Sequence, residues 1–153
     1  MMTDDLIQPL KILLVEDSTQ DIEITRRVFA KGRVRNDLIV VRDGEEALDY
    51  LYHRGRFQDH VTSPCPGLIL LDLNLPKLGG IEVLQQIKQD GDLKTIPVII
   101  LTGSQQNKDN GSDYNIGVNT YIMQKPFEFE SFMQVANAIH GCPILITRSQ
   151  YFS

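Results

Sequence analysis

The sequence lacks any apolar stretch of the roughly 20 residues that a membrane-spanning helix needs. It has no tryptophan and two cysteines, Cys65 and Cys142, without the spacing or neighbouring histidines of a zinc site. We therefore expect two reduced thiols. The N-terminal segment is acidic and lacks the basic and apolar parts of a signal peptide. These absences together predict a cytoplasmic protein with no membrane partner.

Basic residues are also fewer than acidic ones. The chain has 15 Lys and Arg against 20 Asp and Glu, a formal net charge of −5. Because a nucleic-acid-binding surface usually needs a basic face, this balance argues against a nucleic-acid partner. The sequence shows neither internal repeats nor low-complexity segments. Its 153 residues, 42% of them hydrophobic, suffice for one domain with its own core.

Short apolar runs alternate with amphipathic segments along the chain. The runs predict five strands, at residues 11–16, 37–43, 67–72, 95–104 and 119–124. The other segments predict five helices, at residues 18–32, 44–55, 79–92, 107–117 and 127–141. Buried strands separated by helices indicate an α/β fold, a doubly wound, five-stranded parallel sheet of the flavodoxin-like kind with helices on both faces.

Two helices carry more detailed expectations. In the third helix, the inward-facing side chains are predicted to be Ile81, Val83, Leu84 and Ile87. The segment 107–117 is rich in Asn, Asp, Gly and Ser, which are poor helix formers, so we expect a short or mobile helix there.

Polar residues stand where the predicted strands end. The run "LILLD" places Asp72 at the end of an apolar strand, where an unpaired charge would be costly. Glu16 and Asp17 follow the first strand, Thr102 ends the fourth and Lys125 follows the fifth. Because ligands bind at the carboxyl edge of a parallel sheet, we expect these side chains to meet there.

These residue types together favour one chemistry. Crowded carboxylates repel each other, and Mg²⁺ relieves this by binding their oxygens. A carboxylate between Mg²⁺ and a lysine stays ionised and can act as a nucleophile. An incoming phosphoryl group needs cations and hydrogen-bond donors, which Mg²⁺, Lys125 and Thr102 would supply. The set therefore predicts phosphoryl transfer to Asp72.

Taken singly, each residue also has an ordinary structural interpretation. Asp72 would be a turn former or helix cap, and Glu16 and Asp17 would cap the first helix. Thr102 would satisfy its own turn, and Lys125 would be a solvated surface charge. The functional interpretation depends on four strand ends carrying suitable groups at once.

The same set, in this order, resembles the receiver domain of two-component response regulators. The matching stretches are "ILLVEDS" (12–18), "LILLDLNLPKLGG" (68–80), "PVIILTGS" (97–104) and "YIMQKPF" (121–127). The resemblance implies a receiver domain over residues 9–141, a C-terminal tail over 142–153 and no output domain. More narrowly, the chain resembles the single-domain regulators that are paired with cyanobacterial phytochrome kinases and their bacterial relatives.

The resemblance also implies roles for the site residues. It identifies Asp72 as the phosphoacceptor, Thr102 as the switch hydroxyl and Lys125 as the partner of the phosphoryl group. The implied Mg²⁺ ligands are Asp17, Asp72, the backbone carbonyl of Asn74 and, through water, Glu16.

Neighbouring positions match the family as well. Pro126 matches a proline whose preceding peptide is usually cis, and Pro76 and Gly80 match the turn before the third helix. Gly103 matches a small residue that leaves room for the phosphodonor, and Ser104 matches a position that influences the acyl-phosphate lifetime.

The implied function is that of a phosphorylation-dependent switch and not an enzyme. A sensor histidine kinase, phytochrome-like in the narrower resemblance, would supply the phosphoryl group. Output would pass through a downstream protein or a homodimer. The apolar tail segment "CPILIT" would pack either on a neighbour or on its own chain.

One position departs from the family pattern. Receivers usually carry an aromatic residue three positions before the lysine, but Tyr121 lies four before Lys125 and Ile122 takes that place. Since strand side chains alternate between faces, a shift of one residue moves Tyr121 to the other face. We expect a bulge in the strand to absorb the extra residue; the alternative is an aromatic switch that works differently.

Three rival functions remain to be weighed. A small phosphatase with an aspartate nucleophile would carry a D-x-D motif after its first strand, which this chain lacks. A receiver-like docking module without phosphorylation would not need Asp72 and Lys125 together. Nucleotide binding is disfavoured because no Gly-rich phosphate loop follows the first strand.

Overall fold

The computed structural model describes residues 9–103, 119–139 and 144–146. Their five strands form one parallel sheet in the order β2-β1-β3-β4-β5. The strands are β1 (Ile12–Val15), β2 (Leu38–Val41), β3 (Leu68–Asp72), β4 (Val98–Thr102) and β5 (Thr120–Gln124). The predicted doubly wound parallel sheet is therefore confirmed.

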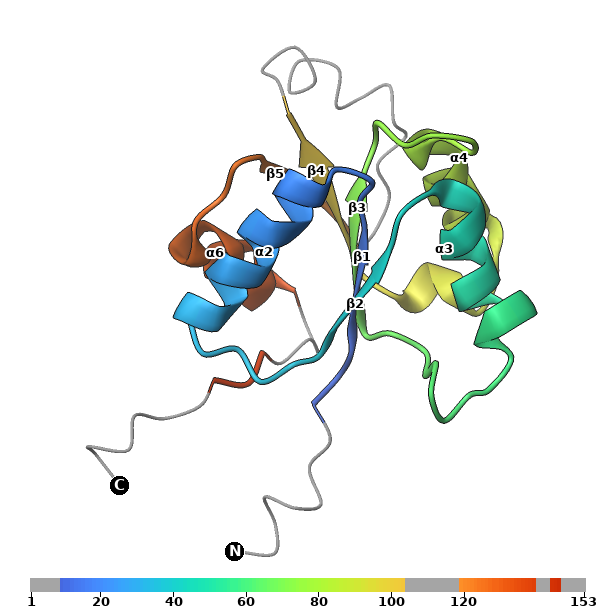
Figure 1. Cartoon of the computed structure of the whole chain (residues 1–153), viewed down its shortest axis with the longest axis horizontal. Coiled ribbons are helices and arrows are strands. Elements are labelled where there is room, and N and C mark those ends of the chain that lie inside the picture. Colours follow the sequence, from blue (N-terminus) through green and yellow to red (C-terminus); the bar gives the residue numbers. More distant parts are fainter. Residues whose placement is uncertain (1–8, 104–118, 140–143, 147–153) are drawn as a thin grey trace, which may run out of the picture.

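Helices cover both faces of this sheet, as Figure 1 shows. They are α2 (Thr19–Lys31), α3 (Gly44–Leu51), α4 (Gly80–Gln89) and α6 (Phe129–Ala138), with short 3₁₀ turns at Gly55–Phe57 and Leu93–Thr95. In Figure 1, α2 and α6 lie on one side of the sheet and α3 and α4 on the other. The helix predicted at 107–117 lies outside the described residues. None of the described helices combines the length and apolarity needed to cross a membrane.

The sequence explains where these helices begin. The Ser18 hydroxyl accepts a hydrogen bond from the Asp21 N–H and caps α2, and Asp43 caps α3 in the same way through the Glu46 N–H. Because α2 follows β1 directly, the cap holds the first turn of α2 at the carboxyl edge of the sheet.

Two apolar cores lie on opposite faces of the sheet. Alternate strand residues face each one: Leu13 and Leu71 pack with α3 and α4, whereas Leu14 and Leu70 pack with α2 and α6. All five residues of β3 are buried, including Asp72. This agrees with a strand in the middle of a parallel sheet that is covered on both faces.

The structure corrects two sequence predictions. Residues Thr120–Gln124 pair one for one with Val98–Thr102, so the bulge predicted in β5 is wrong. The regular alternation puts Tyr121 against the α2/α6 core and Ile122 against the α3/α4 core. Ile81 was expected to face inward but is exposed, because the buried stripe of α4 runs through Gly80, Val83, Leu84 and Ile87.

Part of the C-terminal tail packs on its own chain. Ile146 forms an antiparallel bridge with Val34, and the Leu145 carbonyl accepts a hydrogen bond from the Arg35 N–H. Ile144 contacts the α2/α6 core. For residues 144–146, the structure therefore supports the alternative in which the tail packs on its own chain.

Candidate functional site

The ammonium group of Lys125 lies among three carboxylates at the carboxyl edge of the sheet. Its Nζ donates to Glu16 Oε1 at 2.9 Å, to Asp21 Oδ2 at 2.8 Å and to Asp72 Oδ2 at 3.2 Å. The backbone explains the position of the lysine, since the Lys125 N–H donates to the Thr102 carbonyl just beyond the end of β5. The cluster is partly shielded from water, with Glu16 and Asp72 buried.

Two groups of the cluster, Glu16 and Lys125, have pKa values shifted by their surroundings. The pKa of Glu16 is raised to about 7, chiefly by burial and also by the neighbouring Asp72, while Lys125 acts to lower it. Burial also acts to lower the pKa of Lys125, but its hydrogen bonds to Asp21 and Glu16 outweigh this and raise that pKa. The two pKa shifts are compatible because one ammonium contacts several carboxylates. The surrounding acids stabilise the protonated Lys125, while one of them, Glu16, tends to keep its proton.

Asp17 adds a fourth carboxylate to the cluster, so acidic groups outnumber the single ammonium. One oxygen from each of Glu16, Asp17 and Asp72 lies within 4.8 Å of the others. With Asp21, which contacts Lys125, the cluster holds four carboxylates and one ammonium. Carboxylate oxygens at this spacing are the donor set that a hard divalent cation uses. The residues present therefore fit a divalent metal, with Asp17 at the exposed side of the cluster.

The hydroxyl of Thr102 has no partner in the described part of the chain. The residue is 1% exposed, and its Oγ1 makes no hydrogen bond to described groups. Because an unsatisfied buried hydroxyl costs about 1–3 kcal/mol, a ligand oxygen that accepts from it would recover free energy. Thr102 ends β4, beside Asp72 on β3, since Asp72 pairs with Leu101. The hydroxyl is thus available at the edge that carries the acids.

The turn after β3 holds Asp72 in place. The Asn74 N–H donates to Asp72 Oδ1 at 3.1 Å. The first residue of α4, Gly80, packs so closely that an added Cβ would lie 2.5 Å from the Asp72 carbonyl oxygen. The expected role of the Asn74 carbonyl as a metal ligand stays a prediction.

The loop that carries Asp17 is tied to β2. The guanidinium of Arg42 donates to the Asp17 carbonyl at 3.1 Å and to the Thr19 hydroxyl at 3.2 Å. These two bonds go to the Asp17 backbone and to Thr19, so they hold the loop without engaging the Asp17 carboxylate. Sequence reasoning missed Arg42, because no motif connects the end of β2 with the β1–α2 loop.

The structure brings the predicted strand-end residues together. Glu16 and Asp72 contact Lys125 directly, Asp17 adjoins both acids, and Thr102 ends the neighbouring strand. The peptide between Lys125 and Pro126 is cis, as the resemblance implied. Beside Gly103 an added Cβ would meet no heavy atom of the described chain within 4 Å, which agrees with the expected open space.

The sequence analysis did not include Asp21 among the candidate site residues. In the structure, Asp21 contacts Lys125 as closely as Glu16 does. Its spacing was an available signal, because Asp21 lies one helical turn before the buried Thr25 and so on the inner side of α2.

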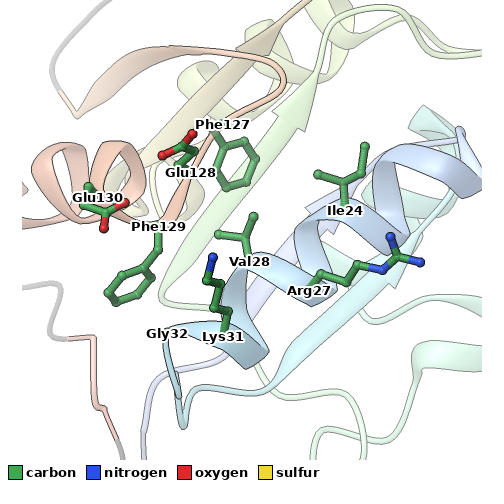
Figure 2. Close-up of a pocket in the computed structure, with 9 residues that line it drawn as sticks. All are labelled: Ile24, Arg27, Val28, Lys31, Gly32, Phe127, Glu128, Phe129 and Glu130. Carbon is green, nitrogen blue, oxygen red and sulfur yellow. The ribbon is translucent and has the colours of Figure 1, made fainter.

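A separate pocket of about 570 Å³ lies between α2 and the start of α6 (Figure 2). Apolar side chains line it together with two basic residues, Arg27 and Lys31, and two acidic residues, Glu128 and Glu130. None of the strand-end acids, Thr102 or Lys125 lines this pocket. Because its two basic and two acidic residues balance, the pocket has no evident preference for an anionic ligand.

Comparisons with known proteins identify the same region. A family model described as the response regulator receiver domain matches residues 12–137. The response regulator Rcp1 of Synechocystis sp. is 45% identical over 121 residues, which cover 79% of this chain and 80% of that protein.

Solved structures agree with this match. The bacteriophytochrome response regulator AtBRR has a TM-score of 0.81 at 37% identity, covering 94% of this chain and 99% of that one. The Mn²⁺-bound form of Rcp1 has a TM-score of 0.68 at 42% identity, with 83% and 89% covered. The phosphorylated cyanobacterial phytochrome response regulator RcpA has a TM-score of 0.68 at 41% identity, with 84% and 89% covered.

Proposed function

Because the chain belongs to the response regulator receiver domain family, we propose that Asp72 accepts a phosphoryl group from a phosphohistidine of a sensor kinase. The observation that carries this proposal is the contact of Lys125 with Asp72 inside a cluster of buried acids, next to the unpartnered hydroxyl of Thr102.

Asp72, Lys125, Thr102 and Gly103 each have a role in this reaction. A carboxylate oxygen of Asp72 attacks phosphorus, and a P–O bond forms as the P–N bond to histidine breaks. The leaving imidazole nitrogen keeps the electron pair and takes a proton from water. Lys125 donates to a phosphoryl oxygen, and Thr102 donates to another after moving toward it. Gly103 leaves the approach open because it has no side chain.

The proposed metal is Mg²⁺. Its ligands would be Asp17, Asp72, the carbonyl of Asn74 and, through water, Glu16. When bound, a divalent cation supplies positive charge for the phosphoryl oxygens. The donor set and the Mn²⁺ in the related Rcp1 structure support this assignment.

The partners are proposed from the relatives. Receiver domains work with histidine kinases, and the similarity to two phytochrome-linked regulators suggests a phytochrome-like kinase. Phosphorylation would be read out by a downstream protein or by homodimerisation. Size-exclusion chromatography before and after phosphorylation separates these two outputs. The exposed free thiol of Cys65 suits a reducing compartment such as the cytoplasm.

The direct test is phosphorylation by acetyl phosphate with Mg²⁺, followed by intact-mass measurement. We expect the wild-type protein to gain one phosphoryl group. Asp72→Asn should abolish the gain, and a chelator should prevent it. The matched control is Asp49→Asn, a half-exposed aspartate on α3 that pairs with Arg54 and should leave the gain unchanged. Labelling that survives Asp72→Asn would disprove the assignment.

A phosphatase is the competing function, since a nucleophilic aspartate also serves hydrolases. A receiver domain is generally not an enzyme, and slow loss of its own acyl phosphate would be its only turnover. Repeated hydrolysis of small phosphoesters by the wild-type protein, abolished in Asp72→Asn, would favour the phosphatase instead.

A further inference from the structure

Lys125 has no spare hydrogen-bond donor in this structure. A lysine ammonium carries three N–H bonds, and Glu16, Asp21 and Asp72 each accept one. A phosphoryl oxygen that binds Lys125 must therefore displace one of these carboxylates. The three acids differ in how easily they can be displaced.

Asp21 is the acid that can leave at least cost. The Glu16 side chain is 1% exposed and that of Asp72 6%, whereas that of Asp21 is 33% exposed. A carboxylate that separates from Lys125 must be rehydrated, and water reaches Asp21 far more readily than the two buried acids. Asp72 is itself the proposed acceptor, so it remains beside the lysine during the reaction.

We propose that Asp21 is a positioning residue that competes with the phosphoryl group for the ammonium of Lys125. In the unphosphorylated protein, it holds Lys125 through the 2.8 Å contact, and it adds a negative charge where an anionic donor must bind. It thereby weakens the binding of anionic phosphodonors. This inference rests on the proposed function and adds Asp21 as a residue that determines how readily Asp72 is phosphorylated.

The experiment measures phosphorylation by acetyl phosphate, at saturating Mg²⁺, as a function of donor concentration. Asp21→Asn removes the charge and keeps an oxygen acceptor, while Asp21→Ala removes both. We expect both to lower the half-saturating donor concentration by about three- to tenfold, a range typical of a partly exposed charge-assisted hydrogen bond. The maximal rate should change less than the half-saturating concentration.

A binding measurement gives a second readout that needs no turnover. Beryllium trifluoride, which mimics a phosphoryl group on an aspartate, should bind both variants more tightly by a similar factor. Raising the ionic strength should reduce the difference from wild type, because screening weakens the repulsion by Asp21. A purely structural role for Asp21 predicts neither the tighter binding nor the salt dependence.

The control is Glu23→Gln, which removes one negative charge from the same helix at an exposed residue paired with Arg26. It should match wild type. If Asp21→Asn behaves like wild type and only Asp21→Ala is impaired, Asp21 orients Lys125 without competing, and the inference is wrong. If the wild-type protein is not phosphorylated at all, the proposed function itself fails.

Discussion

At the scale of single residues, the site depends on close backbone packing around Asp72. An added Cβ at Gly80 would lie 2.5 Å from both the Asp72 carbonyl oxygen and the Leu73 Cα. Both obstacles are backbone atoms, which cannot move aside as a flexible side chain can. Gly80 therefore serves the shape of the site, although glycine is a poor residue inside a helix.

We predict that Gly80→Ala lowers the free energy of unfolding by about 1–3 kcal/mol, as overpacking typically does. It should also slow phosphorylation, because the start of α4 must move away from Asp72 and Leu73. Helix propensity alone predicts the opposite sign, a gain of about 1 kcal/mol. Urea unfolding and the acetyl phosphate assay measure both effects.

The matched control for this substitution is Gly91→Ala. A Cβ there would meet no heavy atom of the described chain within 4 Å. A Gly80→Ala protein as stable and as active as Gly91→Ala would contradict the packing argument.

At the scale of elements, Asp90 joins α3, α4 and the following 3₁₀ turn. Its Oδ1 accepts from the N–H groups of Asp92 and Leu93, and its Oδ2 accepts from the Tyr52 hydroxyl. The hydrogen bonds from Leu93, Tyr52 and Asp92 lower the pKa of Asp90 below its usual value of 3.8. The charged carboxylate is therefore the form that stabilises this junction.

The sign of the pH effect follows from that shift. A lowered pKa in the folded state gives stability that is present above the unfolded pKa and is lost as the pH falls through the folded one. We predict that the stability difference between wild type and Asp90→Asn shrinks as the pH falls from about 5 to about 3. Urea unfolding at several pH values measures it, and a pH-independent difference would contradict the prediction.

At the scale of the whole molecule, Asn36 connects segments that are distant in sequence. Its side chain is buried, donates to the Leu10 carbonyl at 2.9 Å and accepts from the Leu145 N–H at 2.8 Å. It therefore links the chain before β1, the loop before β2 and residues 144–146. This link lies at the amino end of the sheet, away from the acid cluster at the carboxyl end.

We predict that Asn36→Ala lowers the free energy of unfolding by about 1–2 kcal/mol, because two backbone groups lose their partner. Phosphorylation of the folded protein should be unchanged, since the acid cluster lies at the opposite edge. Gln134→Ala, at an exposed position of α6, is the control and should change neither quantity. Equal stability of the two variants in thermal unfolding would contradict this role for Asn36.

For the residues that the structure describes, the sequence by itself determined the order and type of the strands and helices, because apolar periodicity reports burial directly. It also determined the acids, hydroxyl and lysine at the strand ends, since a parallel sheet brings its carboxyl ends to one edge. Asp72 followed from this reasoning, as a carboxylate that an apolar strand tolerates only beside a counter-charge.

Only the tertiary structure decided three other points. The register of β5 depends on pairing with β4, so local sequence did not show that the strand runs without a bulge at Thr120–Gln124. Arg42, after β2, bonds the Asp17 carbonyl in the loop that follows the neighbouring strand β1. The contact of Asp21 with Lys125 joins residues 104 positions apart. Side-chain contacts between distant elements depend on how helices pack on the sheet, which residue spacing along one element does not encode.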